Sequence, residues 1–317
     1  MGDLHTEALE RYDSLFIAPH GSDVPLACPS RVLGEVERGR RCLVLALFEP
    51  AGNSPAAEAV RRLRADYVAA GLPSVRERRP GPAAALATEV RGAGDESAIN
   101  EAVRLLMHVG PSTSAQHIYA PLGLGANVDH RLTYEAAVRS FASETGRNLF
   151  LYEERPEAFV PGAVRTRLAL LGARLPPGGT GAAEGAGLLR LLLRVNEPAR
   201  LRGEMRSLRE RFALLGWATR QWRIARPWNP LRAFGPRLQP VVHPADEDAL
   251  LRAREVANLL LPRGKGNRPR AAGRFNLRAT SAAKQLGGVY HAERFWLFLP
   301  SGDGLPEVQH PLEAVEA

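Results

Sequence analysis

The chain has 317 residues, of which 45% are hydrophobic and 24% are charged, a composition that supports a large buried core and excludes a disordered protein. It has no apolar run of about eighteen residues, which argues against a membrane span. The formal net charge of +8 comes almost entirely from arginine, and the two cysteines are too few for a disulfide framework, so we expect a cytoplasmic protein.

Strands and helices are expected to alternate along the first half of the chain. The expected elements are a strand at 14–18, a helix near 26–38, a strand at 42–48, helices at 54–71 and 97–109, a strand at 116–119, a helix at 132–145 and a strand at 148–153. Ser54 before Pro55 is typical of a helix start, and Gly71 suits a helix stop. Because the strands are continuously apolar, the order predicts an α/β fold: a Rossmann-like, mostly parallel sheet with helices on both faces.

Two short motifs carry side chains that bind divalent metals. His20 and Asp23 follow the first expected strand, and His130 follows the strand at 116–119 at a distance of eleven or so residues. Open α/β sheets place their sites at the carboxyl ends of parallel strands, where these motifs fall. Two imidazoles and one carboxylate would form a three-ligand site with an open position, as in catalytic zinc centres.

The order of four motifs resembles that of the LmbE/PIG-L family of zinc-dependent N-deacetylases. The matching segments are Pro-His-Gly-Ser-Asp-Val at 19–24, Asn-Val-Asp-His at 127–130, Leu-Tyr-Glu-Glu-Arg-Pro at 151–156 and Glu-Arg-Phe-Trp at 293–296. The first two are similar to the family's Ala-His-Pro-Asp-Asp-Glu and His-Pro-Asp-His motifs. The resemblance covers roughly residues 13–165 and 278–298.

This resemblance implies zinc ligation by His20, Asp23 and His130. It also places Ser22 where the family has its general base, an aspartate, and Asn127 where the family has a histidine that stabilises the oxyanion and carries protons. A serine hydroxyl does not hold a proton near neutral pH, and an amide donates a hydrogen bond but no proton. Ordinary deacetylation should therefore be impaired, because a missing general base costs about 10² to 10⁴ in rate and a missing oxyanion contact about 10² to 10³.

Two interpretations follow from these replacements. In the first, a diverged metal-dependent amidohydrolase acts on a small polar N-acylated substrate, an amino sugar or a specialised metabolite, with Asp129, Glu153 or Glu154 as a displaced carboxylate. In the second, the protein is an inactive pseudo-deacetylase that binds a ligand or a protein partner, or a metal enzyme of altered reaction type.

Each ligand also has an ordinary structural explanation. Taken alone, His20 is a hydrogen-bonded loop residue, Asp23 a helix N-cap and His130 a solvent-facing residue at a helix start. Only the joint match to the family favours a metal site. The remaining histidines considered are expected to be structural or surface residues: His108, His117 and His243.

The second half of the chain has a different composition. We expect a metal-binding core over 1–172, a Pro/Gly-rich linker or loop over 173–187, and an Arg-rich helical elaboration over 188–317 that returns to the core at 278–298. Arginines and three tryptophans interleave at 200–237. A basic face of this kind can bind nucleic acid. However, arginine supplies the positive charge throughout this chain, so an arginine-rich stretch is explained by ordinary solvent-exposed surface, and nucleic-acid binding is not expected.

Overall fold

The computed structural model describes residues 12–52, 54–79, 93–124, 127–155, 157–159, 163–176, 234–261, 276, 279 and 291–299. Within these ranges, no helix combines the length and the apolar character that a bilayer crossing requires.

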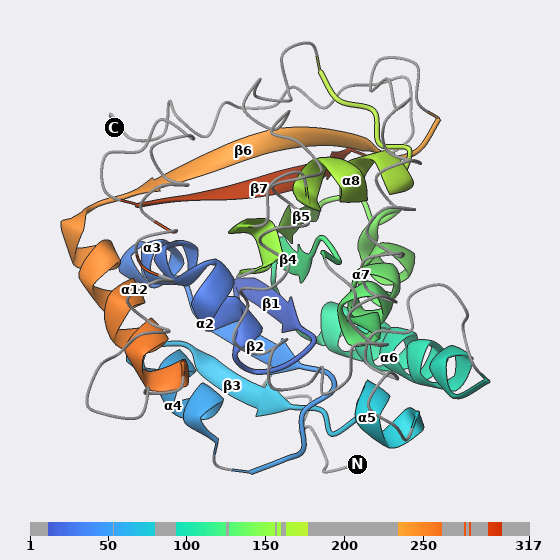
Figure 1. Ribbon diagram of the computed structural model, residues 1–317, viewed down its shortest axis with the longest axis horizontal. Helices are drawn as coiled ribbons and strands as arrows, with labels where there is room; N and C mark the ends of the chain where they lie inside the picture. Colours follow the sequence, from blue (N-terminus) through green and yellow to red (C-terminus); the bar gives the residue numbers. More distant parts are fainter. Residues whose placement is uncertain are drawn as a thin grey trace, which may run out of the picture.

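A mixed sheet of seven strands forms the centre of the described structure (Figure 1). Its strands are β1 (Ser14–Ala18), β2 (Cys42–Ala46), β3 (Asp66–Ala69), β4 (His117–Pro121), β5 (Asn148–Tyr152), β6 (Arg237–Ala245) and β7 (His291–Leu299). In the order β3-β2-β1-β4-β5-β7-β6, the first five strands are parallel, and β7 runs antiparallel to both β5 and β6. The predicted mostly parallel α/β sheet is confirmed.

Helices cover both faces of this sheet. They are α2 (Asp23–Ala27), α3 (Pro29–Glu37), α4 (Pro55–Arg62), α5 (Val75–Arg78), α6 (Ala93–Ser112), α7 (Val128–Phe141), α8 (Ala163–Leu170) and α12 (Glu247–Leu260), with a short 3-10 helix, η2 (Glu157–Phe159). Helices α2, α3, α4 and α12 pack on one face, and α6 and α7 pack on the other (Figure 1).

The central strand β1 is buried on both faces, which explains its continuous apolar sequence. Leu15 and Ile17 point into the core under α6 and α7, whereas Phe16 and Ala18 point into the core under α2, α3 and α4. All four are fully buried. This alternation between two cores follows from the two-residue period of a strand.

The expected helix at 54–71 is wrong in its second half. Ser54 does cap α4, with its hydroxyl accepting from the Ala57 amide at 3.2 Å, but the helix ends at Arg62. Arg64 then adopts a left-handed conformation with φ 59°, and the chain turns into β3 beside β2. The gain from sheet pairing and burial outweighs the helix propensity of this segment.

Two elements of the second half of the chain join the core before residue 278, where the chain is expected to return to it. Strand β6 and helix α12 both precede that residue, and α12 packs against α2, α3 and α4. The domain boundaries stay a prediction, because 177–233, which holds most of the expected linker and the Arg-rich stretch, lies outside the described residues.

Strand β7 also fixes the start of α3. The Glu293 carboxylate accepts hydrogen bonds from the backbone amides of Ser30 at 2.8 Å and Arg31 at 2.9 Å. These are first-turn amides of α3, which have no partner within the helix itself. The Glu-Arg-Phe-Trp motif thus ties the end of the described chain to the helix that follows the first metal motif.

Candidate metal centre

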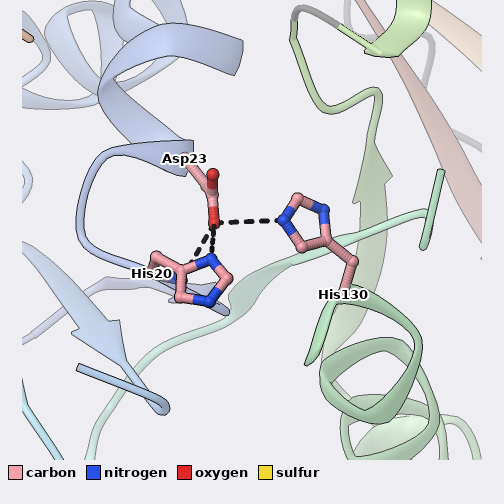
Figure 2. A group of neighbouring side chains, drawn as sticks. All are labelled: His20, Asp23 and His130. Carbon is pink, nitrogen blue, oxygen red and sulfur yellow. Dashed lines mark hydrogen bonds and ion pairs between the residues drawn. The ribbon is translucent and has the colours of Figure 1, made fainter. Parts of the chain in front are cut away.

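Three predicted ligands lie together at one edge of the sheet. His20 leaves the end of β1, Asp23 begins α2, and His130 lies in the first turn of α7. In Figure 2, Asp23 lies between the two imidazoles, with its Oδ2 atom 3.2 Å from His20 Nδ1 and 3.6 Å from His130 Nε2. One ligand atom from each residue lies within 4.8 Å of the others.

This edge is the point where the strand order reverses. From β1 the sheet extends to β2 and β3 on one side and to β4 and β5 on the other. Because these strands are parallel, the loops after β1, β4 and β5 leave from the same edge. Such a switch point is the usual binding crevice of an open α/β sheet, and it explains how residues distant in sequence meet.

The loop that carries His20 is held by backbone hydrogen bonds to carboxylates. The His20 amide donates to Asp23 Oδ2 at 2.9 Å, and the Gly21 amide donates to Glu49 Oε2 at 2.5 Å. A Cβ atom at Gly21 would lie only 2.4 Å from the Tyr67 hydroxyl and 2.7 Å from Ala56 Cβ. The tight approach of these neighbours requires glycine here.

On the side away from Asp23, the His20 ring contacts a second carboxylate. His20 Nε2 lies 3.1 Å from Asp129 Oδ2. Asp129 is fully buried and also accepts from the Val75 amide at 3.1 Å and from the Arg78 guanidinium at 2.8 Å. The His20 Nε2 proton is therefore directed to Asp129, which leaves Nδ1 for the centre of the group.

His130 has the same arrangement with a different carboxylate. Its Nδ1 lies 3.3 Å from Glu154 Oε1, which also accepts from the amides of Gly123 at 2.7 Å and Leu124 at 2.8 Å. Gly123 has φ +79°, a conformation that favours glycine, and this turn presents both amides to the carboxylate. The His130 Nε2 atom is thereby directed toward Asp23.

The donor set fits a divalent metal. Two imidazole nitrogens and one carboxylate oxygen converge, and each imidazole is backed by a buried carboxylate, the arrangement that orients histidine ligands in metal sites. A metal would be held by His20 Nδ1, Asp23 Oδ2 and His130 Nε2. The ligand assignment itself stays a prediction.

In the protein alone, the same atoms form a network of ion pairs. Burial lowers the pKa of His20, but hydrogen bonds to Asp129 and Asp23 outweigh it and raise that pKa to about 10. Burial likewise lowers the pKa of His130, and the charges of Asp23 and Glu154 raise it to about 9. Burial raises the pKa of Asp23, yet the two histidines bring it down to about 2.

Ser22 and Asn127, the predicted replacements, both lie at helix starts. Ser22 is half-buried at the N-cap of α2, and its hydroxyl does not cap the helix. Asn127 caps α7, with Oδ1 accepting from the Asp129 amide at 3.0 Å. Because the amide oxygen is engaged by a backbone N–H, the Asn127 NH₂ group is the part left to donate to another molecule.

The three carboxylates considered as a displaced base each have hydrogen-bond partners, although Glu154 uses only its Oε1 atom. Asp129 and Glu154 back the histidines, as described above. Glu153 turns to β7 instead, where its Oε1 accepts from Arg294 at 2.5 Å and from the Trp296 indole at 2.9 Å. The structure therefore offers no support for proton abstraction by Glu153, and it gives Asp129 and Glu154 an orienting role.

A further carboxylate near the site was not found from the sequence. Glu157 of η2 lies within electrostatic reach of His130 and Asp23. Burial, the largest effect, raises the pKa of Glu157, and the charge of His130 acts against this increase. Glu157 directly follows the Leu-Tyr-Glu-Glu-Arg-Pro motif at 151–156, at a position for which that motif predicts no acidic residue.

The three other histidines considered in the sequence lie apart from this group. His108 is exposed on α6, His117 begins β4 with its ring 5.9 Å from that of Phe150, and His243 lies on β6 near Gly34 of α3.

Comparisons with known proteins agree with this architecture. No family model and no curated protein matches the sequence. Among solved structures, the zinc-inhibited form of a teicoplanin deacetylase is similar, with a TM-score of 0.54 and 15% identity over 92% of this chain and 99% of that chain. The deacetylase of the A40926 pseudoaglycone is also similar, with a TM-score of 0.50 and 15% identity over 93% and 100% of the two chains.

This chain shares the α/β fold of the teicoplanin deacetylase. At this level of identity the likeness concerns the fold and does not extend to substrate or activity. It agrees with the fold that the LmbE/PIG-L resemblance implies, and the chain spans nearly the whole length of both neighbours.

Proposed function

We propose that this protein is a zinc-binding, diverged amidohydrolase of the N-deacetylase type, acting in the cytoplasm on an N-acylated amino sugar or specialised metabolite. The observation that carries the proposal is the convergence of His20, Asp23 and His130, with each imidazole backed by a buried carboxylate. The fold shared with the two deacetylases supports the same reaction class.

Zinc suits the donor set better than a hard cation does. Magnesium and calcium prefer all-oxygen sites, whereas two imidazoles with one carboxylate are typical of catalytic zinc centres. When bound, such a metal polarises a carbonyl and lowers the pKa of a water molecule to about 7.

The chain's own residues would orient the reactants. Asp129 and Glu154 fix the two imidazole rings, and the Asn127 NH₂ group is a neutral donor for the oxygen of an amide carbonyl. Ser22 supplies no carboxylate where the family has its base. Hydrolysis adds water across the amide C–N bond and releases a carboxylate and an amine, and the amine must gain a proton that neither Ser22 nor Asn127 can deliver.

The first prediction concerns these two replaced positions. Ser22→Asp combined with Asn127→His should raise the rate of amide hydrolysis by at least about 10²-fold, because each change restores a group worth about that factor or more. Release of primary amine from a panel of N-acetylated amino sugars, measured with stoichiometrically zinc-loaded protein, gives the rates.

Adding His20→Asn to the double variant is the control, since a gain that depends on the metal site must then disappear. If the wild-type protein already hydrolyses the panel as fast as the double variant, the two replacements are not the cause of impairment and this account is wrong.

The pseudo-deacetylase is the second candidate function. It is favoured by the engagement of Asp129 with Val75 and Arg78 and of Glu153 with Arg294 and Trp296, which turns both carboxylates to other partners. Stoichiometric zinc, no turnover by the wild-type protein and turnover by the double variant together would select this candidate.

A further inference from the structure

We propose that Arg78 is a positioning residue for the metal site, holding Asp129 so that Asp129 in turn holds the His20 ring. The affinity of the site for metal then depends on α5 and on the first turn of α6, neither of which supplies a ligand. The inference rests on the metal-binding part of the proposed function.

Arg78 is placed between two buried aspartates. One terminal nitrogen of its guanidinium lies 2.8 Å from Asp129 Oδ1, and its Nε lies 3.1 Å from Asp95 Oδ1. The Arg78 side chain is 4% exposed, and both carboxylates are fully buried. The guanidinium also contacts the Pro73 carbonyl and lies 5.0 Å from the centre of the Phe48 ring.

These contacts form a chain of alternating charge that ends at His20. Asp95, in the first turn of α6, pairs with Arg78 and Arg79, Arg78 pairs with Asp129, and Asp129 contacts His20 Nε2 at 3.1 Å. A rigid planar guanidinium can contact two carboxylates at once, which a single ammonium on a flexible stem does poorly. Arg78 therefore fixes the position of Asp129 as well as neutralising it.

Helix α5 is a single turn, so its place depends on these contacts. The Val75 amide at its start donates to the same Asp129 carboxylate at 3.1 Å. Asp129 is thus held by one backbone and one side-chain donor from α5, and both are lost if this turn moves. The orientation of a histidine ligand is sensitive to such partners, whose removal typically costs about 10 to 100-fold in metal affinity.

The test compares zinc affinity in variants of two arginines on the same helix. Arg78→Met should weaken zinc binding by about 10 to 100-fold in competition with a chelator. Arg76→Met, at an exposed position of α5, should change it by less than about twofold. An unchanged affinity in Arg78→Met would overturn the inference.

A double-mutant cycle separates positioning from a general loss of stability. If Arg78 acts through Asp129, Arg78→Met should have little further effect on zinc affinity once Asp129→Asn is present. Equal effects of Arg78→Met in both backgrounds would show that it acts by another route, and would overturn the inference.

A measurement on the wild-type protein covers the case in which Arg78→Met does not fold. If the position of α5 affects zinc affinity, zinc binding must in turn stabilise the position of α5. Zinc should therefore slow hydrogen exchange of the Val75 amide. Unchanged exchange at Val75, in protein that binds zinc, would contradict the coupling while leaving the proposed function intact. Failure of the wild-type protein to bind zinc would overturn both.

Discussion

His20 and His130 each meet a carboxylate on both sides of the ring: Asp23 on one side of each, with Asp129 or Glu154 on the other. In the absence of metal this favours the protonated, doubly donating imidazole. A metal would take the place of a proton on each ring, so the same two imidazoles and three carboxylates serve either a cation or two imidazolium ions.

The pH dependence of stability follows from these histidines. Their folded-state pKa values of about 10 and about 9 exceed the unfolded value of about 6.5. Their contribution is therefore full below pH 6.5 and is lost as pH rises through the folded values. Between about pH 7 and 8.5, the free energy of unfolding of chelator-treated protein should fall by up to about 1.4 kcal/mol per pH unit for each histidine.

Urea unfolding at several pH values, with chelator present, measures this slope. His117 and His243 have pKa values lowered by burial, so they oppose the trend only below about pH 6.5. His20→Asn should reduce the slope, and excess zinc should remove it. A stability that rises over this pH window would show that the two rings are not charged in the folded protein.

For individual residues, the sequence predicts the three side chains that converge at the candidate metal site, but it does not predict the residues that surround them. His20, Asp23 and His130 could be found because each falls in a motif at a strand end. Arg78 falls in no motif, and its partner Asp129 is distant in sequence. The sequence places Asp129 and Glu154 near the site as carboxylates, and the structure shows that each contacts an imidazole.

Among the elements, α3 depends on a strand far away in the sequence. Glu293 of β7 accepts from two first-turn amides of α3 and is buried near Arg155, which donates to the Ala292 carbonyl at 2.7 Å. The helix cannot satisfy these amides with its own residues, because Cys28 at its N-cap makes no side-chain cap.

Removing this contact should be costly. Glu293→Ala should lower the free energy of unfolding by about 3 kcal/mol, because it uncaps α3 and removes one of the negative charges that stabilise buried Arg155. Asp246→Ala is the matched control, since Asp246 caps α12 at an exposed position and its loss should cost about 1 kcal/mol. If denaturant unfolding gives the same loss of free energy for Glu293→Ala and Asp246→Ala, the burial of Glu293 makes no additional contribution to stability.

Element types were predictable where the local pattern was strong. The strands at 14–18 and 148–153 were found almost to the residue, because they are short, apolar and bounded by polar turns. The local pattern predicts a helix where strand β3 forms, since the pairing of β3 with β2 is a long-range effect. Helix α7 starts at Val128, earlier than the expected residue 132, because Asn127 caps it.

For the molecule as a whole, the two borders of 177–233 lie side by side. The Gly235 amide donates to the Gly172 carbonyl at 2.7 Å, the Arg174 amide donates to Pro236 at 2.8 Å, and Leu238 donates back to Arg174 at 2.9 Å. Because the residues that flank this segment lie together, a linker can connect them without moving the elements on either side.

Replacing 177–233 with a short Gly/Ser linker should therefore leave the sheet folded and zinc binding unchanged. Far-ultraviolet circular dichroism, cooperative unfolding and zinc stoichiometry would check this. A deletion extended through β6, to residue 245, is the comparison and should not fold, because β7 would lose one of its neighbours. Loss of folding in the shorter replacement would show that the segment is part of the core.

Strand β7 is inserted between β5 and β6 although it follows both in the chain. During synthesis on the ribosome, β5 and β6 leave the exit tunnel before residues 291–299 do. Until β7 pairs with them, each of these two strands has an unpaired edge. Open strand edges invite pairing with other chains. We therefore expect the nascent protein to need shielding late in translation, and a premature stop before β7 to yield aggregates.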